Sequence, residues 1–418
     1  MPVSIGHSLR VDPTVRELRG PLVVLGVTSA QTCLVLKGRV RALRDAGFRV
    51  TLISSPGALL DELARDEGAD RIELRMRRAI APLSDLRALV QLWRTLRKLQ
   101  PDIVEFSTPK AGLLGMLAAR FARVPRRVYL LRGLKLETAG GLKRVLLASA
   151  EWFAMACADV VLCNSASLMA KAVTYRLAPQ RKLCVLGAGS GIGVDCDHFA
   201  QARAVSRAEL GIPECSVVIG FTGRLTRDKG VLLLFEAFER IHQSHPEVYL
   251  LLVGWWDKAE DAVEAEFREE ILSHPNVRCS GFTRDVASYL RAMDIFALPT
   301  YREGFPNAIL EASAAALPVV TTDATGARDA IVPDVTGLMV PAGSAEALLG
   351  ALLKLLQDSR LREEMGQEGR QWVRENFERR HVLSLNSQFY RDLLVGIWSA
   401  ISRAALRQTE ALQRLATD

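Results

Sequence analysis

The amino-acid sequence predicts an α/β protein with two doubly wound parallel sheets that follow one another along the chain. The length of 418 residues exceeds what one ordinary hydrophobic core accommodates, so we expect two domains. Short apolar runs alternate with segments of helical spacing, which is typical of a parallel sheet covered on both faces. The alternation restarts at Ser216, after a loop-rich segment, and this restart indicates a second unit of the same kind.

The first half begins with the buried strand Pro21–Thr28. A helix in "LKGRVRALRDAG" ends at Gly47, and the strand Phe48–Ser55 follows it. The segment Leu83–Gln100 has helical spacing, with Ser84 as its N-cap, and it ends before a proline. Three further strands are expected in "DIVEFS", "RRVYLLR" and "DVVLCNS".

The second half repeats this order, from the strand Ser216–Leu225 and the helix "GVLLLFEAFERIHQ" to the strands "PVVTTD" and "GLMVP". A helical region, Ala345–Asp418, ends the chain and is broken near Phe377. We therefore expect Rossmann-like domains at residues 1–197 and 198–385, and a helical segment at 386–418 that packs back onto the first domain.

The most apolar run of the chain, Val145–Cys163, contains Glu151 and Asp159. We expect a buried helix followed by a buried strand there, not a membrane-spanning helix. The start of the chain lacks the apolar core of a signal peptide, and the seven cysteines form no C-x-x-C pair. These features predict a cytoplasmic protein with reduced thiols and no zinc site.

Positive charge is concentrated in the first half. Residues 1–200 contain 30 Lys and Arg against 17 Asp and Glu, whereas the whole chain contains 54 against 47. This asymmetry suggests that the first half faces anionic lipid, a phosphorylated acceptor or nucleic acid. The alternative is that arginine is simply a favoured surface residue. Aromatic residues make up only 6% and are not interleaved with the basic ones, which argues against nucleic acid.

The glycine-rich stretch "GAGSGIG", Gly187–Gly193, invites comparison with dinucleotide-binding loops. It lacks the G-x-G-x-x-G spacing, because position 192 is isoleucine, and it has no strand-turn-helix context. We interpret it as a connection between domains.

Basic residues follow the first strand of the second domain. Gly223 and Arg224 come directly after that strand, and Lys229 precedes the next helix. Arginine offers a planar fork and lysine a point charge, so together they suit a diphosphate. Taken alone, the pair is a weak signal, because Arg and Lys in a loop are normally just solvated.

The stretch "EGFPNAILE", Glu303–Glu311, places two carboxylates around a predicted helix start. A helix N-terminus favours an anion, and each carboxylate can accept hydrogen bonds from sugar hydroxyls. A nucleotide sugar has this layout of groups. The alternative is that Glu303 merely complements the helix dipole. The candidate donor contacts between the two glutamates are Gly304, Phe305, Pro306, Asn307 and Ala308.

These motifs resemble the retaining glycosyltransferases of family 4, whose fold is GT-B. The resemblance is carried by "FTGRLTRDKG", "DIFALPTYREGFPNAILEASAAALPVVTTDATGARDAI" and "TGLMVP", and the glutamate pair matches the family's E-x7-E signature. The first half is similar to a bacterial polysaccharide and lipid-linked glycan subgroup, through "FRVTLISSPG", "TPKAGLLGMLAARFARVPRRVYLLRG" and "NSASL".

The resemblance implies a role for each motif. Arg224 and Lys229 would bind the donor diphosphate, Glu303 the donor sugar and Glu311 the ribose hydroxyls. Glu303, Arg224 and Lys229 are thus the candidate catalytic residues. The resemblance also implies that catalysis needs no metal and no cofactor besides the nucleotide-sugar substrate. It further implies that backbone at four positions approaches the donor: Gly38, Gly223, Gly326 and Ala327.

The first half departs from the family in lacking histidines near its strand ends. Glu105 and Arg132 stand at such strand ends, and Lys110 lies in "TPKAG". These three residues are candidate acceptor-side substitutes, and the alternative is that they are ordinary helix-start or surface residues.

The sequence as a whole predicts a retaining, metal-independent hexosyl- or N-acetylhexosaminyltransferase. Its acceptor would be a polyprenyl-diphosphate-linked glycan, reached by peripheral contact of the basic first half with the inner face of the plasma membrane. Two alternatives share the scaffold: a sugar-nucleotide 2-epimerase and a catalytically silent partner subunit.

Overall fold

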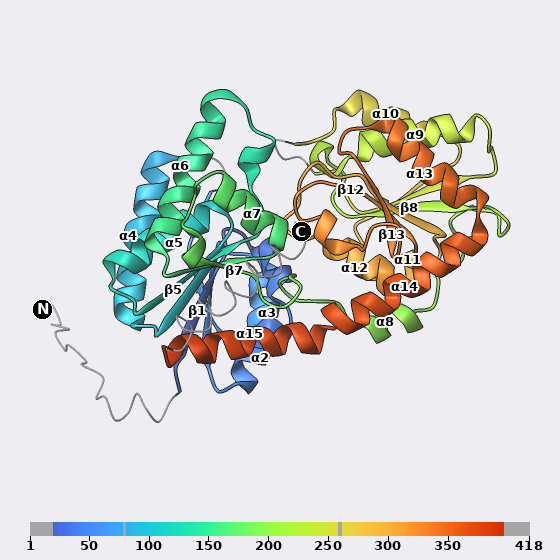
Figure 1. Cartoon of the computed structure of the whole chain (residues 1–418). Coiled ribbons are helices and arrows are strands. Elements are labelled where there is room, and N and C mark those ends of the chain that lie inside the picture. The colour runs from blue at the N-terminus through green and yellow to red at the C-terminus, as the bar shows by residue number, and fades with distance from the viewer. Residues whose placement is uncertain (1–19, 78–80, 258–260, 397–418) are drawn as a thin grey trace, which may run out of the picture. The chain divides into compact units, whose positions relative to one another are not determined.

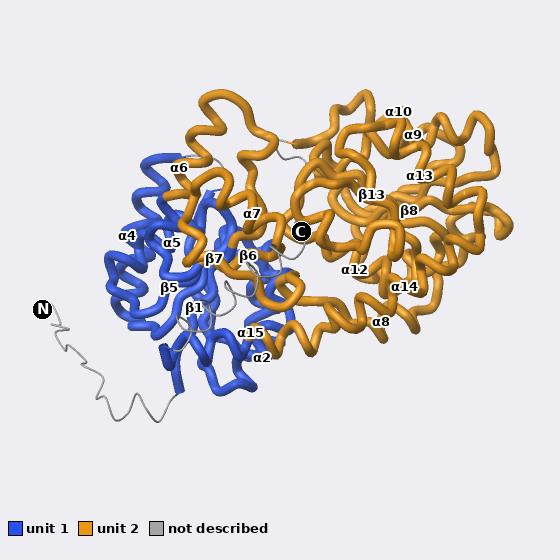
Figure 2. Tube along the Cα trace, viewed as in Figure 1, with its two compact units in different colours: residues 1–130, 153–160, 387–418 blue, residues 131–152, 161–386 orange. Residues whose placement is uncertain are grey.

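The computed structural model describes residues 20–77, 81–257 and 261–396. The chain divides into two compact units, which Figure 2 shows in separate colours. The first unit comprises residues 1–130, 153–160 and 387–418, and the second unit comprises residues 131–152 and 161–386. The domain boundaries expected at residues 197 and 385 stay a prediction.

The first sheet has seven strands in the order β3-β2-β1-β4-β5-β6-β7. Strand β1 is buried along its whole length, which explains its continuous apolar sequence. Strand β4 is buried as well, although it contains Glu105 and Ser107. The strands are β1 (Leu22–Gly26), β2 (Arg49–Ser54), β3 (Asp70–Glu73), β4 (Ile103–Ser107), β5 (Arg126–Leu131), β6 (Val160–Cys163) and β7 (Leu183–Cys184). The helices between them are η1 (Ala30–Leu36), α2 (Arg39–Asp45), α3 (Ala58–Glu67), α4 (Pro82–Leu99), α5 (Pro109–Phe121), η2 (Lys135–Glu137), α6 (Gly141–Cys157), α7 (Ala166–Thr174) and η3 (Gln180–Lys182).

The second sheet has six parallel strands in the order β10-β9-β8-β11-β12-β13. Figure 1 shows α9 and α13 on one face of it and α12 and α14 on the other. The strands are β8 (Val218–Thr222), β9 (Tyr249–Val253), β10 (Val277–Gly281), β11 (Ile295–Leu298), β12 (Val319–Thr322) and β13 (Gly337–Val340). The helices are α8 (Cys196–Gln201), η4 (Arg227–Lys229), α9 (Val231–His242), α10 (Ala265–Ser273), α11 (Val286–Leu290), α12 (Asn307–Ala314), η5 (Arg328–Ala330), α13 (Ala345–Gln357), α14 (Ser359–Phe377) and α15 (Arg379–Leu394).

Two helix starts differ from the prediction. Helix α4 begins at Pro82 rather than after Ser84, because proline fits the first turn and the Asp85 carboxylate accepts the N–H of Ala81 (3.1 Å). Helix α2 begins only at Arg39, because Gly38 adopts a left-handed conformation (φ 80°) that interrupts the predicted longer helix.

The terminal helical region breaks at Phe377, as predicted, and also at Asp358. Its last helix, α15, carries Tyr390 into the core of the first unit, where the phenol contacts the buried ion pair Arg39–Glu105. The predicted helix beyond residue 396 lies outside the described residues.

Helix α6 is not the buried helix that the sequence predicts. The following strand β6 is buried, but the outer face of α6 carries several half-exposed apolar side chains. Periodicity alone could not separate the two cases, because both faces of this helix are apolar. No helix among the described residues is long and apolar enough to cross a membrane.

Candidate active site

The first candidate residues lie at the carboxyl end of strand β8, where the strands of the second sheet end. Its five residues are buried, and Gly223 and Arg224 follow at its end. A Cβ on Gly254, at the end of neighbouring β9, would lie 1.7 Å from the carbonyl oxygen of Gly223. The ends of β8 and β9 therefore approach more closely than side chains would allow, and the backbone of Gly223 and Gly254 is not covered by side chains of its own.

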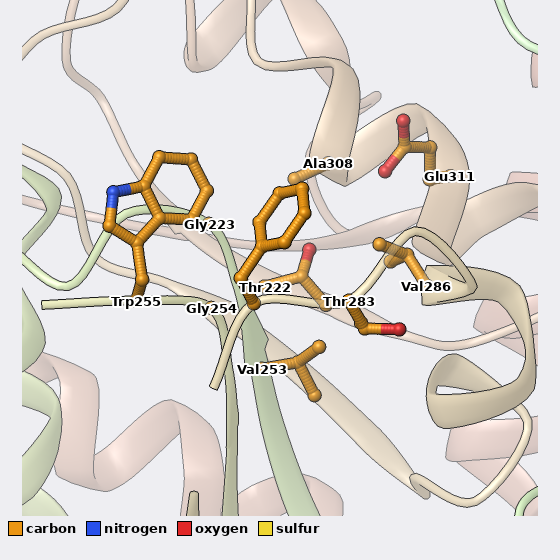
Figure 3. A pocket seen from close by; sticks show the side chains of 10 residues that line it. Thr222, Gly223, Val253, Gly254, Trp255, Thr283, Val286, Ala308 and Glu311 are labelled. Atoms are coloured by element: carbon orange, nitrogen blue, oxygen red, sulfur yellow. The ribbon is translucent and has the colours of Figure 1, made fainter. Parts of the chain in front are cut away.

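A hollow of about 130 Å³ lies at the ends of these strands. Trp255 and Phe282 form an edge-to-face pair in its wall, with ring centroids 5.4 Å apart. Figure 3 shows Trp255 and Glu311 on opposite sides of the hollow. Aromatic rings beside a few polar groups suit a flat, partly apolar ligand group such as a nucleobase. The lining residues are Thr222, Gly223, Val253, Gly254, Trp255, Phe282, Thr283, Val286, Ala308 and Glu311.

The start of α12 lies beside this hollow. The helix begins at Asn307, as predicted, and its N-cap Pro306 offers no side-chain hydrogen bond to the first turn. The unsatisfied N–H groups and the helix dipole at such an end favour an anion. Asn307 is oriented by Ser190, whose hydroxyl lies 3.3 Å from the amide oxygen, and Phe305 packs against Phe377.

Glu311 lies one turn into α12 and is partly buried. Burial raises the pKa of its carboxyl from an ordinary 4.5 to about 7, and the nearby cation Arg379 opposes this rise. A carboxylate held at such a site gains from hydroxyl donors that a ligand supplies. Hydroxyl donors from a ligand would thus offset part of the cost of burying this charge.

Replacing Glu311 by glutamine is expected to stabilise the ligand-free protein at alkaline pH. The raised folded-state pKa means that the parent loses stability as pH rises from about 4.5 through about 7, whereas glutamine does not titrate. A rise of this size corresponds to at most about 3 kcal/mol. Melting temperatures from pH 5 to pH 9 check this: the advantage of Glu311→Gln should grow across the interval. A constant difference would contradict the burial of a charge.

The predicted catalytic cations both have carboxylate partners. Lys229 contacts the Glu303 carboxylate, and the side chains are 21% and 11% exposed. Arg224 contacts Asp257 at 2.7 Å. The structure thus brings Lys229 and Glu303 together, one from η4 and one from the loop before α12. An anionic ligand entering here would exchange a carboxylate for a phosphate as the partner of each cation.

Backbone around Glu303 is tightly packed within the second unit. A Cβ on Gly304 would lie 1.7 Å from the carbonyl oxygen of Arg132, so only glycine fits there. The N–H of Gly326 is donated to the hydroxyl of Ser167 (2.8 Å), and that of Ala327 to the carbonyl of Ala324 (3.1 Å). These two N–H groups, expected from the resemblance to approach the donor, are therefore bonded inside the protein.

The remaining candidates belong to the first unit. Gly38 donates its N–H to Glu67, the last residue of α3. Lys110 binds Asp85 through both carboxylate oxygens (2.8 and 2.7 Å). Glu105 is 1% exposed and is held by Arg39, so its side chain faces the interior and its acceptor-side role gains no support.

Sequence reasoning missed the aromatic wall of the hollow. Trp255 and Phe282 are 39% and 58% exposed. Trp255 lies two residues after the end of the mostly buried strand β9, and Phe282 directly follows the half-buried strand β10. An exposed aromatic residue immediately after a parallel strand is the signal that "LLLVGWW" and "RCSGFT" contain.

Comparison with known proteins explains why these groups converge. The family model described as "Glycosyl transferases group 1" matches residues 202–372, and "Glycosyl transferase 4-like domain" matches residues 35–189. The capsular polysaccharide biosynthesis glycosyltransferase CapM of Staphylococcus aureus is 34% identical over 369 residues, covering 88% of this chain and 96% of that protein. The chain belongs to the group 1 glycosyltransferases.

More distant relatives of this glycosyltransferase are named for lipid-linked substrates. The UDP-Gal:alpha-D-GlcNAc-diphosphoundecaprenol alpha-1,3-galactosyltransferase of Escherichia coli is 26% identical over 322 residues, covering 76% of this chain and 82% of that protein. Among solved structures, HepE of Anabaena with UDP-glucose has a TM-score of 0.71 at 20% identity, covering 89% of this chain and 99% of that one. The family, the GT-B fold and the glycosyltransferase class predicted from the sequence are confirmed.

Proposed function

We propose that this glycosyltransferase moves a sugar, with retention, from a nucleotide-sugar donor to a polyprenyl-diphosphate-linked acceptor during assembly of a bacterial polysaccharide. The observation that carries the proposal is the placement of Glu303, beside Lys229, and Glu311, in the hollow, around the uncapped start of α12. The names of the Escherichia coli and Staphylococcus aureus relatives support the lipid-linked acceptor and the polysaccharide product.

The donor would be a UDP-sugar, as the name of the Escherichia coli relative suggests, and its parts would lie along the site in order. Its base would occupy the hollow beside Trp255 and Phe282, and its ribose hydroxyls would bond to Glu311. The diphosphate would lie at the start of α12, where Arg224 and Lys229 neutralise it. The sugar would then reach Glu303.

The chemical step needs little besides charge stabilisation. The bond from the anomeric carbon to the donor phosphate oxygen breaks, and the nucleotide diphosphate leaves with the electron pair. The acceptor hydroxyl forms its bond on the same face of the sugar, and its proton passes to the departing phosphate oxygen. Arg224 and Lys229 supply the positive charge for the leaving group, so we propose that no metal is required.

On the acceptor side we propose a role for the segment after β5, which belongs to the second unit. Arg132 is the best placed candidate, because its carbonyl oxygen packs against Gly304, next to Glu303. We also propose a cytoplasmic location with peripheral contact to anionic lipid, which the excess of basic residues in the first half supports. Arg75 and Arg77 are exposed cations of that half, and Arg78 lies outside the described residues.

A two-step assay tests the function. Nucleotide sugars are first screened for thermal stabilisation, and the stabilising donor is then incubated with lipid-linked acceptors while product mass is measured. One donor is expected to stabilise the protein, by about 2.7 kcal/mol at 100 times its Kd, and to add one sugar to the acceptor. Conversion of the donor to an epimer without transfer would favour the epimerase. Stabilisation with no turnover on any acceptor would favour a silent subunit.

A further inference from the structure

Glu137 is a carboxylate near the candidate site to which none of the sequence motifs points. It ends the short helix η2, and it belongs to the second unit, as does the loop 299–306 between β11 and α12, here called the Glu303 loop. Its Oε2 accepts a hydrogen bond from the hydroxyl of Thr325 (2.6 Å). Its Oε1 is buried and has no hydrogen-bond partner among the described residues. A buried carboxylate is costly, so the groups that hold it in place are informative.

Charge also ties Glu137 to the Glu303 loop. Burial raises the pKa of the Glu137 carboxyl above its ordinary 4.5. The hydroxyl of Thr325 and the cations Lys171 and Arg302 oppose this rise. Arg302 lies in the Glu303 loop, and its Nε donates a hydrogen bond to the hydroxyl of Thr138 (2.9 Å), the residue after η2. The end of η2 is therefore joined to this loop by both charge and hydrogen bonding.

Thr325 connects Glu137 to the backbone of Glu303. Its hydroxyl is donated to Glu137, and its carbonyl oxygen accepts the N–H of Glu303 (2.9 Å). Thr325 is only 5% exposed. Its β-branched side chain has few rotamers, so the direction of the hydroxyl is coupled to the position of the backbone. The hydrogen bond to Glu137 therefore restrains the carbonyl that holds Glu303.

Close packing of backbone passes this restraint to the whole of the adjoining turn. A Cβ on Gly326 would lie 2.7 Å from the carbonyl oxygen of Gly304 and 2.8 Å from that of Glu303. Gly326 also has a φ of 78°, which favours glycine. Because packed backbone has no spare volume, a displacement of residues 325–326 must displace Glu303 and Gly304 as well.

We propose that Glu137 is a positioning residue for sugar transfer, which fixes the backbone of Glu303 through Thr325 and so directs the Glu303 carboxylate at the donor sugar. The inference rests on the proposed function, which assigns Glu303 to that sugar. Glu137 itself would not touch the substrate, because Thr325 occupies its Oε2 and its Oε1 is buried. Its loss should therefore change turnover and leave the binding of the nucleotide unchanged.

Two variants break the contact from opposite sides, Glu137→Ala and Thr325→Val. Two conservative variants keep it: Glu137→Gln retains an acceptor and Thr325→Ser retains the donor. The matched control is Thr321→Val on β12, which removes another buried threonine hydroxyl, donated to the carbonyl of Leu298 (2.8 Å). That carbonyl also accepts the N–H of Thr300 (2.9 Å), so the control leaves it with a partner.

Glu137→Ala and Thr325→Val are each expected to lower turnover by at least about tenfold, since small misplacements of a reacting group cost about 100-fold. UDP binding should be unchanged in both. Glu137→Gln and Thr325→Ser should keep most of the parent's turnover. Thr321→Val should lower the melting temperature and keep normal turnover, because a purely structural loss of a buried hydroxyl does not move Glu303.

Double variants show whether Glu137 acts through the other two residues. Glu137→Ala combined with Thr325→Val should lose no more turnover than either change alone, because both break one hydrogen bond. In a Glu303→Gln background, Glu137→Ala should have little further effect, since the carboxylate that it positions is already replaced.

Thermal shift gives a readout that does not depend on transfer. The intact donor should stabilise the parent more than UDP does, because Glu303 would contact the sugar. Glu137→Ala should lose this difference, as Glu303→Gln should, while both variants keep the stabilisation by UDP.

Turnover of Glu137→Ala equal to that of the parent would overturn the inference. So would losses that multiply when Glu137→Ala is combined with Glu303→Gln, since the two residues would then act separately. Absence of product with every lipid-linked acceptor would refute the proposed function instead. The stabilisation by donor relative to UDP would still decide the role of Glu137, and an unchanged difference in Glu137→Ala would exclude it.

Discussion

Replacing Lys229 by alanine is expected to lower turnover by about 100- to 1000-fold, the usual cost of removing one group that stabilises developing negative charge. In the ligand-free protein Lys229 contacts Glu303 at the start of the site, and its side chain is 21% exposed. When the donor diphosphate departs, this ammonium would neutralise the negative charge that develops on it. The variant also frees Glu303 from its cation, which places an unpaired carboxylate beside the phosphates and adds to the loss.

The measurement is product formation with the donor found in the thermal screen, together with calorimetric titration of UDP and of uridine. Lys229→Ala should weaken UDP binding much more than uridine binding. Arg227→Ala is the matched control. It removes a cation from the same short helix, η4, but the ion pair of Arg227 is with the exposed Glu264 and not with Glu303. Equal losses for the two ligands would refute a phosphate role. Loss of parent turnover on adding a chelator would refute the metal-free mechanism.

Replacing Glu303 by glutamine is expected to lower turnover by about 100-fold while leaving UDP binding nearly unchanged. Glu303 lies ahead of α12 and outside the hollow, where the sugar of the donor would be placed. Small misplacements of a reacting group cost about this much in rate. UDP has no such sugar, so its affinity should not depend on this carboxylate.

Glu311→Gln provides the contrast, because this side chain lines the hollow. It should weaken UDP binding by about 1–2 kcal/mol, since hydrogen bonds to charged groups contribute about 1.5–3 kcal/mol. Titrations with UDP and turnover with the full donor are compared for the two variants. If Glu303→Gln keeps turnover within a few fold of the parent, Glu303 would be only a residue that complements the helix dipole, and its assignment to the donor sugar would be wrong.

The position of the glutamate pair follows from local sequence. Proline ahead of Asn307 and an apolar run after it predict the helix start, and α12 begins there. Strand β8 and the basic residues after it were equally predictable, because a buried parallel strand has a continuous apolar sequence. In these places local backbone preference and burial agree, so a short window of sequence is sufficient.

The burial of a side chain and the partner of a backbone N–H depend instead on which residues pack against them in the fold. In "VLLASAEWFAMAC" apolar residues occur on every side of the helix, and only packing decides that Ala154 and Met155 are buried whereas Trp152 and Phe153 are exposed. Gly326 has an N–H that resemblance assigns to the donor, but the hydroxyl of Ser167, far away in the sequence, accepts it. The spacing of residues along the sequence does not predict which of them lie close together in the folded chain.

The sequence by itself determined the family, the two parallel sheets and the residue types available for a nucleotide sugar. The succession of strands and helices along the chain and the E-x7-E spacing follow from interactions between residues close in the chain or from burial of whole segments. The tertiary structure alone decided that Lys229 contacts Glu303, that Glu105 is buried against Arg39, and that Trp255 and Phe282 form one wall. These pairs join separate loops and helices, and their partners are chosen by the packing of the folded chain.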